Sequence, residues 1–352
     1  MTDSTLLVSL QTGIPLCRCP FAVIAEECGL SEFAVIDSLE RLFADGTARR
    51  FGAVFDVRRL GYISTLCALT LTETEREIVI PRIVPHQGIT HCYLRGWPDE
   101  LNSSLPGGPQ DAPAPNIWFT FAALADSFNS ELQALRSILH PHRLIVLPAV
   151  RRFKIDVVFD PRTRDRSEAV PQVKKRGNGK ADIDDRPVRF SSREKDVIRL
   201  MQGSLPVCSE PFTFIAEQTG YSLAGLLDLL RRWQESGVIR RIGIIVRHHQ
   251  VGFKANGMCV WKIPEDRSIA AGRTLAEQPE VTHCYERAVT DDFPYNIYAM
   301  IHTDCWENTR QLFERIGSAA GLNGGRLLCS LQEYKKTSPR YFSEETDEIR
   351  EL

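Results

Sequence analysis

Two short segments of the chain carry the side chains best suited to chemistry, and their sequences are nearly the same. Residues 90–95 read Thr-His-Cys-Tyr-Leu-Arg, and residues 282–287 read Thr-His-Cys-Tyr-Glu-Arg. Because successive side chains of a β-strand point to opposite faces, His283, Tyr285 and Arg287 would form one row on a strand. A row of imidazole, phenol and guanidinium groups suits an anionic substrate. The alternative is a polar sheet face that only contacts solvent.

The next predicted strand differs between the two halves of the chain. In the second half, alternation places four more side chains on one face, namely Asn296, Tyr298, Met300 and His302. In the first half the asparagine is kept as Asn116, but Trp118 replaces the tyrosine and Ala122 replaces the histidine. A Pro- and Gly-rich loop, 96–115, precedes this strand in the first half and could cover or block a pocket.

A basic segment, residues 240–249, is predicted to be a strand that ends in two histidines. It reads Arg-Arg-Ile-Gly-Ile-Ile-Val-Arg-His-His. Alternation puts Ile242, Ile244 and Val246 on a core face. It puts on the other face Arg241, Gly243, Arg247 and His249. A glycine among arginines would let a flat ligand approach the backbone. His248 and His249 have no counterpart in the first half, and each could equally be a structural histidine.

These segments belong to a longer internal repeat. Pro20-Phe21 and Gly29 of the first half return as Pro211-Phe212 and Gly220, and Arg-Arg-x-Gly occurs in both halves. The repeat is much longer than the roughly 50 residues of the longest solenoid periods, so it indicates a duplicated pair of domains. We therefore expect an internal pseudo-dimer.

Each half is predicted to contain two domains. It opens with two short helices around a Gly-containing turn, followed by the basic strand, which is the outline of a winged helix-turn-helix module. Ser31 is expected to cap the second helix of the first module. The later patterns give the β-α-β-β-α-β order of a ferredoxin-like domain. The fold class is therefore α+β, with a first helix-turn-helix module at 1–60, a first ferredoxin-like domain at 61–160, a flexible linker at 161–190, a second helix-turn-helix module at 191–250 and a second ferredoxin-like domain at 251–352.

Composition narrows the function classes. The chain has 352 residues, 43% of them hydrophobic, and a formal net charge of −2, which is unfavourable for gripping a polyanionic duplex. No run approaches the roughly 18 apolar residues of a membrane span, and no signal sequence is evident, so a cytoplasmic location is expected. In that reducing compartment most of the ten cysteines should be free thiols.

Several familiar sites are not found in the sequence. Walker and Gly-x-Gly-x-x-Gly motifs are lacking, as are the paired carboxylates of glycoside hydrolases. The helices that would read DNA carry Glu32, Asp37 and Glu40 in one copy and begin Leu-Ala-Gly-Leu-Leu-Asp in the other. Base readers need Arg, Lys, Asn or Gln there. We therefore expect these modules to be structural or pocket-forming elements.

Three motifs of the second half together carry a family resemblance. They are Arg-Arg-x-Gly-x3-Arg-His-His-x2-Gly-Phe-Lys-x-Asn at 240–256, His-Cys-Tyr-x-Arg at 283–287 leading to Pro-Tyr-Asn-x-Tyr at 294–298, and Glu-Tyr-Lys-Lys at 333–336. The chain resembles the siroheme decarboxylases, which are Lrp/AsnC-like proteins of heme d1 and alternative heme biosynthesis. The resemblance covers nearly the whole chain. The fused arrangement is similar to the single-chain form of the heme d1 route in denitrifying bacteria.

The resemblance implies a carboxy-lyase that removes carbon dioxide from two acetate side chains of siroheme and leaves 12,18-didecarboxysiroheme. One active pocket is expected, built mainly from the second half. The expected catalytic residues are His249, His283, Tyr285 and Arg287, with His249 or His283 as the proton donor. The expected substrate-binding residues are Arg241, Arg247, His248, Asn296, Tyr298, His302, Lys335, His91 and Arg95. His248 is also a candidate for a contact to the substrate iron.

Because decarboxylation with protonation is redox-neutral, no cofactor beyond siroheme and its iron is expected, and no metal site of the protein itself. The expected partners are siroheme, further copies of the chain and other enzymes of the heme d1 pathway that hand over substrate or product, with no nucleic acid and no membrane. One alternative is an Lrp/AsnC-like transcription regulator that senses a tetrapyrrole or an amino acid. A second alternative is a heme or siroheme carrier without catalysis.

Overall fold

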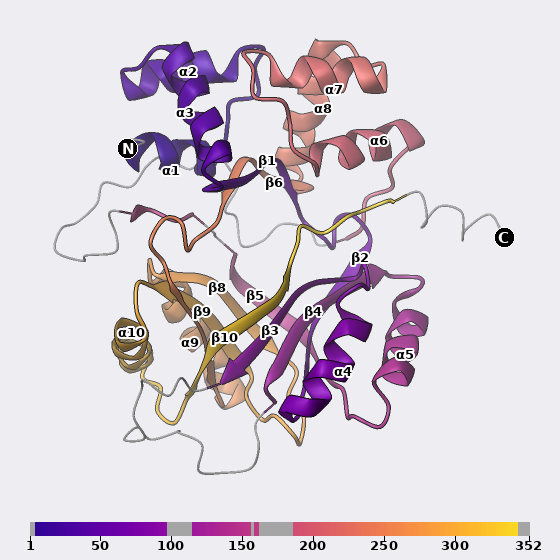
Figure 1. Cartoon of the computed structure of the whole chain (residues 1–352), viewed down its shortest axis with the longest axis vertical. Coiled ribbons are helices and arrows are strands. Elements are labelled where there is room, and N and C mark those ends of the chain that lie inside the picture. The colour runs from indigo at the N-terminus through magenta and orange to yellow at the C-terminus, as the bar shows by residue number, and fades with distance from the viewer. Residues whose placement is uncertain (1–3, 97–114, 156–157, 162–185, 344–352) are drawn as a thin grey trace. The chain divides into compact units, whose positions relative to one another are not determined.

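The structure is a computed structural model that describes residues 4–96, 115–155, 158–161 and 186–343 (Figure 1). The chain forms two compact units. Unit 1 contains Met1–Gly61, Val158–Gly252 and Arg340–Leu352, and unit 2 contains Tyr62–Val157 and Phe253–Pro339. Each unit therefore takes residues from both halves of the sequence.

Unit 1 contains two modules of three helices and a strand. The first module has α1 (Ser4–Thr12), α2 (Pro20–Cys28), α3 (Glu32–Ala44) and β1 (Ala48–Phe55). The second module has α6 (Ser192–Met201), α7 (Pro211–Thr219), α8 (Leu223–Glu235) and β6 (Ile239–Val246).

The prediction of only two helices per module was wrong, since α1 and α6 precede them. Helix α1 is buried over most of its length, so it lacks the polar face that makes a helix recognisable in a sequence. Helix α6 follows the linker directly and begins with a capping box between Ser191 and Glu194.

Local sequence accounts for the turn within each module. The predicted cap is confirmed, because the Ser31 hydroxyl accepts a hydrogen bond from the Ala34 N–H at 3.2 Å. Ser222 plays the same part in the second module. The preceding helices end at Gly29 and Gly220, whose φ values of 66° and 68° favour glycine.

The strands of the two modules pair with each other. β1 and β6 form a two-stranded antiparallel sheet in which Gly52 lies opposite Gly243. The pairing joins the two copies of the repeat within unit 1, as an internal pseudo-dimer requires.

Unit 2 contains two copies of the predicted β-α-β-β-α-β order. The first copy has β2 (Tyr62–Leu69), α4 (Glu73–Ile83), β3 (Ile89–Gly96), β4 (Ile117–Leu124), α5 (Phe128–Leu139) and β5 (Ile145–Ile155). The second copy has β7 (Ala255–Trp261), α9 (Glu265–Glu277), β8 (Val281–Arg287), β9 (Ile297–Thr303), α10 (Trp306–Ala319) and β10 (Arg326–Lys336).

The last strand of each copy joins the two copies into a closed barrel with the order β10-β3-β4-β2-β5-β8-β9-β7. Strand β5 pairs with β2 through residues 145–148 and then with β8 through residues 149–155. Strand β10 does the same with β7 and β3. The two copies therefore share one continuous sheet (Figure 1).

In the described part of unit 2, strand alternation gives three apolar cores. One core packs the first copy's strands against α4 and α5, and another packs the second copy's strands against α9 and α10. A third core lies on the opposite, inner face of the barrel and contains Trp118, Leu147, Val260 and Tyr298 from both copies. Polar residues that alternate with the outer cores therefore face the barrel interior.

Parts of two predicted segments lie outside the described residues, namely 162–185 of the predicted linker and 97–114 of the predicted loop. At the described end of the linker, the Val188 N–H donates to Arg59 O at 2.9 Å, and the Arg59 guanidinium donates to Arg186 O at 2.7 Å. All ten cysteines are free thiols, in line with the sequence prediction. Within the described ranges, no helix is long and apolar enough to cross a membrane.

Candidate functional site

The predicted row on β8 is confirmed as a row on one face of the strand. Cys284 belongs to the outer core, whereas the Arg287 guanidinium lies over the rings of Tyr285 at 4.8 Å and Tyr298 at 5.5 Å. The His283 and Tyr285 rings are nearly parallel, with centroids 6.4 Å apart. Because Tyr298 belongs to the inner core, the row of three residues lies on the inner side of the barrel.

Arg287 is a cation without a carboxylate partner among the residues that the structure describes. Its Nη1 donates to Leu147 O at 2.8 Å, while its Nε has no hydrogen-bond partner in the described part of the chain. Burial lowers the pKa of Arg287. A guanidinium in this setting would gain from an anionic ligand, because such a ligand would supply the missing charge and hydrogen bonds.

The neighbouring Tyr298 is 3% exposed, and its phenol oxygen also has no hydrogen-bond partner among the described residues. Burial raises the pKa of Tyr298, although the nearby Arg287 acts in the opposite direction. In the first copy, Trp118 stands in this place and donates from Nε1 to Pro115 O at 2.7 Å. The unsatisfied phenol is therefore specific to the second copy.

Arg95 and Tyr93 repeat part of this arrangement in the first copy. The Arg95 guanidinium lies 5.2 Å from the centre of the Tyr93 ring and donates to Leu328 O at 3.2 Å. Burial lowers the pKa of Arg95 to about 10. Both copies thus hold an arginine against the last strand of the other copy, and this arginine is buried in the first copy and half-buried in the second.

Thr282 is not among the predicted site residues, yet it connects two of the predicted site histidines. Its hydroxyl lies 3.1 Å from His283 Nδ1, 3.4 Å from His302 Nδ1 and 3.2 Å from Met300 O. In the first copy, Thr90 Oγ1 lies 2.9 Å from His91 Nδ1. The threonine that precedes the histidine in both copies was the signal available in the sequence.

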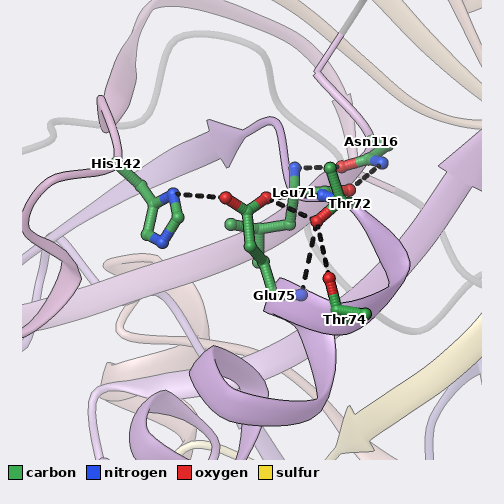
Figure 2. A network of polar contacts seen from close by, with 6 residues as sticks. All are labelled: Leu71, Thr72, Thr74, Glu75, Asn116 and His142. Carbon is green, nitrogen blue, oxygen red and sulfur yellow. Dashed lines mark hydrogen bonds and ion pairs between the residues drawn. The ribbon is translucent and has the colours of Figure 1, made fainter.

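Asn296 is engaged in holding the start of β9. Its side-chain amide donates to Ile263 O at 2.9 Å and accepts from the Ile263 N–H at 2.8 Å. Figure 2 shows the same pair of hydrogen bonds in the first copy, where Asn116 binds both backbone groups of Leu71. This repeated contact is a structural role; the substrate-binding role of Asn296 stays a prediction.

Lys335 also has a structural contact that repeats in the other copy. Its ammonium group donates to the carbonyl oxygens of Val84 and His86, the latter at 2.9 Å, just beyond the end of α4. Burial lowers the pKa of Lys335. Lys154 donates in the same way to Gln278 O at 2.9 Å, at the end of α9. Both lysines therefore stabilise helix C-termini.

In unit 1, Arg241 binds the end of a helix. Its Nη1 donates to the carbonyl oxygens of Gln11 and Ile244. The equivalent Arg50 donates to Gln202 O, beside the end of α6. The expectation that Gly243 leaves space for a flat ligand was wrong, because a Cβ there would lie 2.6 Å from Leu10 O.

The prediction that this strand continues to His249 was also wrong. Strand β6 stops at Val246, and a turn follows in which the Gln250 N–H donates to Arg247 O at 2.9 Å. Alternation therefore does not place Arg247 and His249 in a row with Arg241. The turn's backbone hydrogen bonds replace those of a sheet, which the sequence pattern did not reveal.

The two adjacent histidines of this turn differ in exposure. His248 is 3% exposed and stacks on Phe159 with ring centroids 5.6 Å apart. His249 is exposed, and the centroid of its ring lies 4.0 Å from that of His248. Arg247 is exposed and lies 3.4 Å from Gly46 O. These three residues belong to unit 1, and the row on β8 belongs to unit 2.

Among the described residues, no group of three or more His, Cys, Asp or Glu side chains could hold a metal ion. The chemistry that the inner face of unit 2 offers is therefore that of imidazole, phenol and guanidinium groups. Such a set binds anions and transfers protons.

Two family models match the chain. One describes an AsnC-like ligand binding domain and matches residues 59–154 and 250–335. The other describes a siroheme decarboxylase NirDL-like HTH domain and matches residues 3–49 and 194–240. Both models match twice, once in each half of the sequence.

Individual relatives match over nearly the full length. A siroheme decarboxylase of Hydrogenobacter thermophilus is 33% identical over 97% of this chain and 95% of its own length. The crystal structure of the siroheme decarboxylase NirDL has a TM-score of 0.69 at 29% identity, covering 99% of this chain and 96% of that one. The same protein in complex with an iron-uroporphyrin III analogue gives a TM-score of 0.68 at 28% identity, with the same coverage. The chain belongs to the siroheme decarboxylase family.

Proposed function

We propose that this protein is an enzyme that decarboxylates siroheme, converting two acetate side chains to methyl groups and giving 12,18-didecarboxysiroheme. The similarity to a siroheme decarboxylase over 97% of the chain is the observation that carries the proposal. The solved relative bound to an iron-uroporphyrin III analogue supports a tetrapyrrole carrying several carboxylates as the ligand.

The proposed reaction is a non-oxidative carbon–carbon cleavage. The bond between the acetate methylene and its carboxylate breaks, carbon dioxide leaves, and the electron pair is accommodated by the macrocycle. One proton then forms the new C–H bond, so each side chain consumes one proton and releases one carbon dioxide. Because electrons balance without an oxidant, the proposal includes no cofactor besides siroheme and its iron.

The second copy's row on the inner face of the barrel supports specific roles. Arg287, whose Nε has no hydrogen-bond partner among the described residues, is suited to bind and orient a substrate carboxylate. His283 is suited to supply the proton, since imidazole titrates near neutral pH. His249 in unit 1 remains the alternative proton donor, and His248 remains the candidate contact to the substrate iron.

The proposal is tested by incubating the purified protein anaerobically with siroheme and following the ligand's mass. We expect the loss of two carbon dioxide units through a mono-decarboxylated species. Tight binding of siroheme without a change in the ligand's mass would contradict decarboxylase activity and favour a sensor or a carrier. Salt-dependent, sequence-specific DNA binding would then identify the sensor.

A further inference from the structure

We propose that Thr282 is a positioning residue that holds His283 and His302 in one tautomer, with the proton on Nδ1 and the reactive lone pair on Nε2. The inference rests on the proposed decarboxylation for its functional meaning. It starts from three contacts of one hydroxyl group, which are those to Met300 O, His283 Nδ1 and His302 Nδ1.

The direction of the hydrogen bonds to the two rings follows from the proton count when Thr282 donates to Met300 O. A threonine hydroxyl has one hydrogen to donate and two lone pairs to accept with, whereas a carbonyl oxygen can only accept. When Thr282 donates to Met300 O at 3.2 Å, its oxygen can only accept from the two rings. Both imidazoles must then carry a proton on Nδ1, and Nε2 becomes the atom that gains or gives up a proton.

The first copy lacks the features that fix this arrangement. Thr90 Oγ1 lies 2.9 Å from both His91 Nδ1 and Thr120 Oγ1. Each of the two hydroxyls can donate or accept, so this network is compatible with either tautomer of His91. Ala122 stands where the second copy has His302. A threonine that bridges two histidines is therefore found in the second copy and not in the first.

A fixed Nδ1–H tautomer allows His283 to transfer protons repeatedly through Nε2. In the proposed reaction, the Nε2–H of the imidazolium gives its proton to the carbon that has lost carbon dioxide, and the electron pair of the broken bond forms the new C–H bond. The neutral ring that remains still has its proton on Nδ1, already bonded to Thr282. No tautomer exchange is needed before Nε2 takes up the next proton.

The tautomers are measured directly by NMR of the full-length protein labelled with ¹⁵N-histidine at about pH 8, where ordinary imidazoles are neutral. Signals are assigned with His283→Gln and His302→Gln. We expect pyrrole-like Nδ1 and pyridine-like Nε2 in both rings. Thr282→Val, which removes only the hydroxyl, should shift both rings toward the other tautomer, and Thr282→Ser should retain the wild-type pattern. The matched variant Thr90→Val should change the His91 signals alone.

An Nε2–H tautomer of His283 or His302 in the wild-type protein would overturn the proposal, and so would a Thr282→Val spectrum identical to wild type. Changes in the His283 and His302 signals in Thr90→Val would also overturn the proposal, because Thr90 contacts neither ring. Because these spectra need no substrate, they are independent of whether the protein decarboxylates siroheme.

Kinetics test the functional half of the inference. With siroheme as substrate, Thr282→Val should lower kcat on the order of 10- to 100-fold with KM nearly unchanged, and Thr282→Ser should restore most of the rate. An unchanged kcat in Thr282→Val would overturn the positioning role. A wild-type protein that does not turn over siroheme would instead contradict the proposed function and leave the tautomer result standing.

Discussion

The polar residues that occur in both copies of the repeat are largely engaged in holding the fold. Lys154 and Lys335 bind carbonyl oxygens at helix ends, and Asn116 and Asn296 each bind one backbone segment. By contrast, Tyr298 occurs only in the second copy, and its phenol on the inner face of the barrel has no hydrogen-bond partner in the part of the chain that the structure describes. The His-Cys-Tyr-x-Arg motif is common to both copies, whereas Tyr298 and His302 are found only in the second copy.

Removing the Tyr298 hydroxyl should separate function from stability. Tyr298→Phe takes away a buried group that has no hydrogen-bond partner among the described residues, so the free energy of unfolding should be unchanged or slightly higher. If the phenol contacts substrate, siroheme turnover should fall about 10-fold, as expected for the loss of roughly 1.4 kcal/mol of transition-state stabilisation. Urea unfolding and steady-state kinetics on the same preparation measure both quantities. A large loss of stability would show that the hydroxyl has a structural partner.

Arg241 and Arg50 form a matched pair for testing whether Arg241 binds substrate. Both donate to carbonyl oxygens at the end of a helix. Arg241→Met and Arg50→Met should each lower the free energy of unfolding by about 1 to 3 kcal/mol, because the carbonyl oxygens lose their donors. We expect KM for siroheme to stay the same in both variants. A KM raised only in Arg241→Met would support the substrate-binding role predicted from the sequence.

At the level of secondary structure, the equivalent helices of the two copies begin differently. Thr72 and Glu75 form a capping box at the start of α4, and Glu75 Oε1 also lies 3.9 Å from His142 Nδ1 (Figure 2). The hydrogen bond from the Thr72 backbone N–H is the largest cause that lowers the pKa of Glu75. Helix α9, the equivalent in the second copy, begins after Pro264 without such a cap.

The lowered pKa of Glu75 predicts how its contribution varies with pH. A carboxyl group whose pKa is lowered by folding stabilises the protein at pH values above its ordinary pKa of about 4.3. This stabilisation is lost as the pH falls below that value. Glu75→Gln keeps a capping-box side chain without the charge. The stability difference between wild type and Glu75→Gln should therefore be larger at about pH 7 than at about pH 3.5, as measured by urea unfolding.

Glu73→Gln is the control for this comparison, because Glu73 lies in the same first turn but outside the capping box. Its effect on the free energy of unfolding should depend less on pH than that of Glu75→Gln. An equal stability difference for Glu75→Gln at both pH values would contradict the capping-box explanation.

At the level of the whole molecule, the two copies of the repeat have the same order of helices and strands in unit 2 but differ in their inner-face side chains. The last strand of each copy in unit 2 pairs first with a strand of its own copy and then with a strand of the other copy, so the two copies close one barrel together. The first copy has Trp118 and Ala122 where the second copy has Tyr298 and His302, and it still completes the barrel. This explains how the first copy can serve as a scaffold.

Equivalent histidines of the two copies test this division of labour. His283→Ala should lower siroheme turnover by about 100-fold or more, as expected for the loss of a general acid. His91→Ala removes the equivalent ring, which also contacts a threonine, and should have a much smaller effect. Rates measured by ligand mass distinguish the cases. A loss confined to His91→Ala would move the active site to the first copy.

The sequence by itself determined the features that depend on neighbouring residues. The helix caps at Ser31 and Ser222, the glycine turns and the alternating row of His283, Tyr285 and Arg287 all follow from spacings of a few residues. The internal repeat and the family motifs were equally visible, because they are properties of the order of residues.

Only the tertiary structure decided which distant segments meet. It showed that β5 and β10 close the barrel, that Arg241 binds the end of α1, and that Thr282 joins His283 to His302. It also showed that β6 ends before His248 and His249. Arginine, lysine and threonine can serve a ligand or a backbone carbonyl equally well, so their residue type leaves the partner open. The partner is fixed by the folding of elements that lie far apart in the sequence.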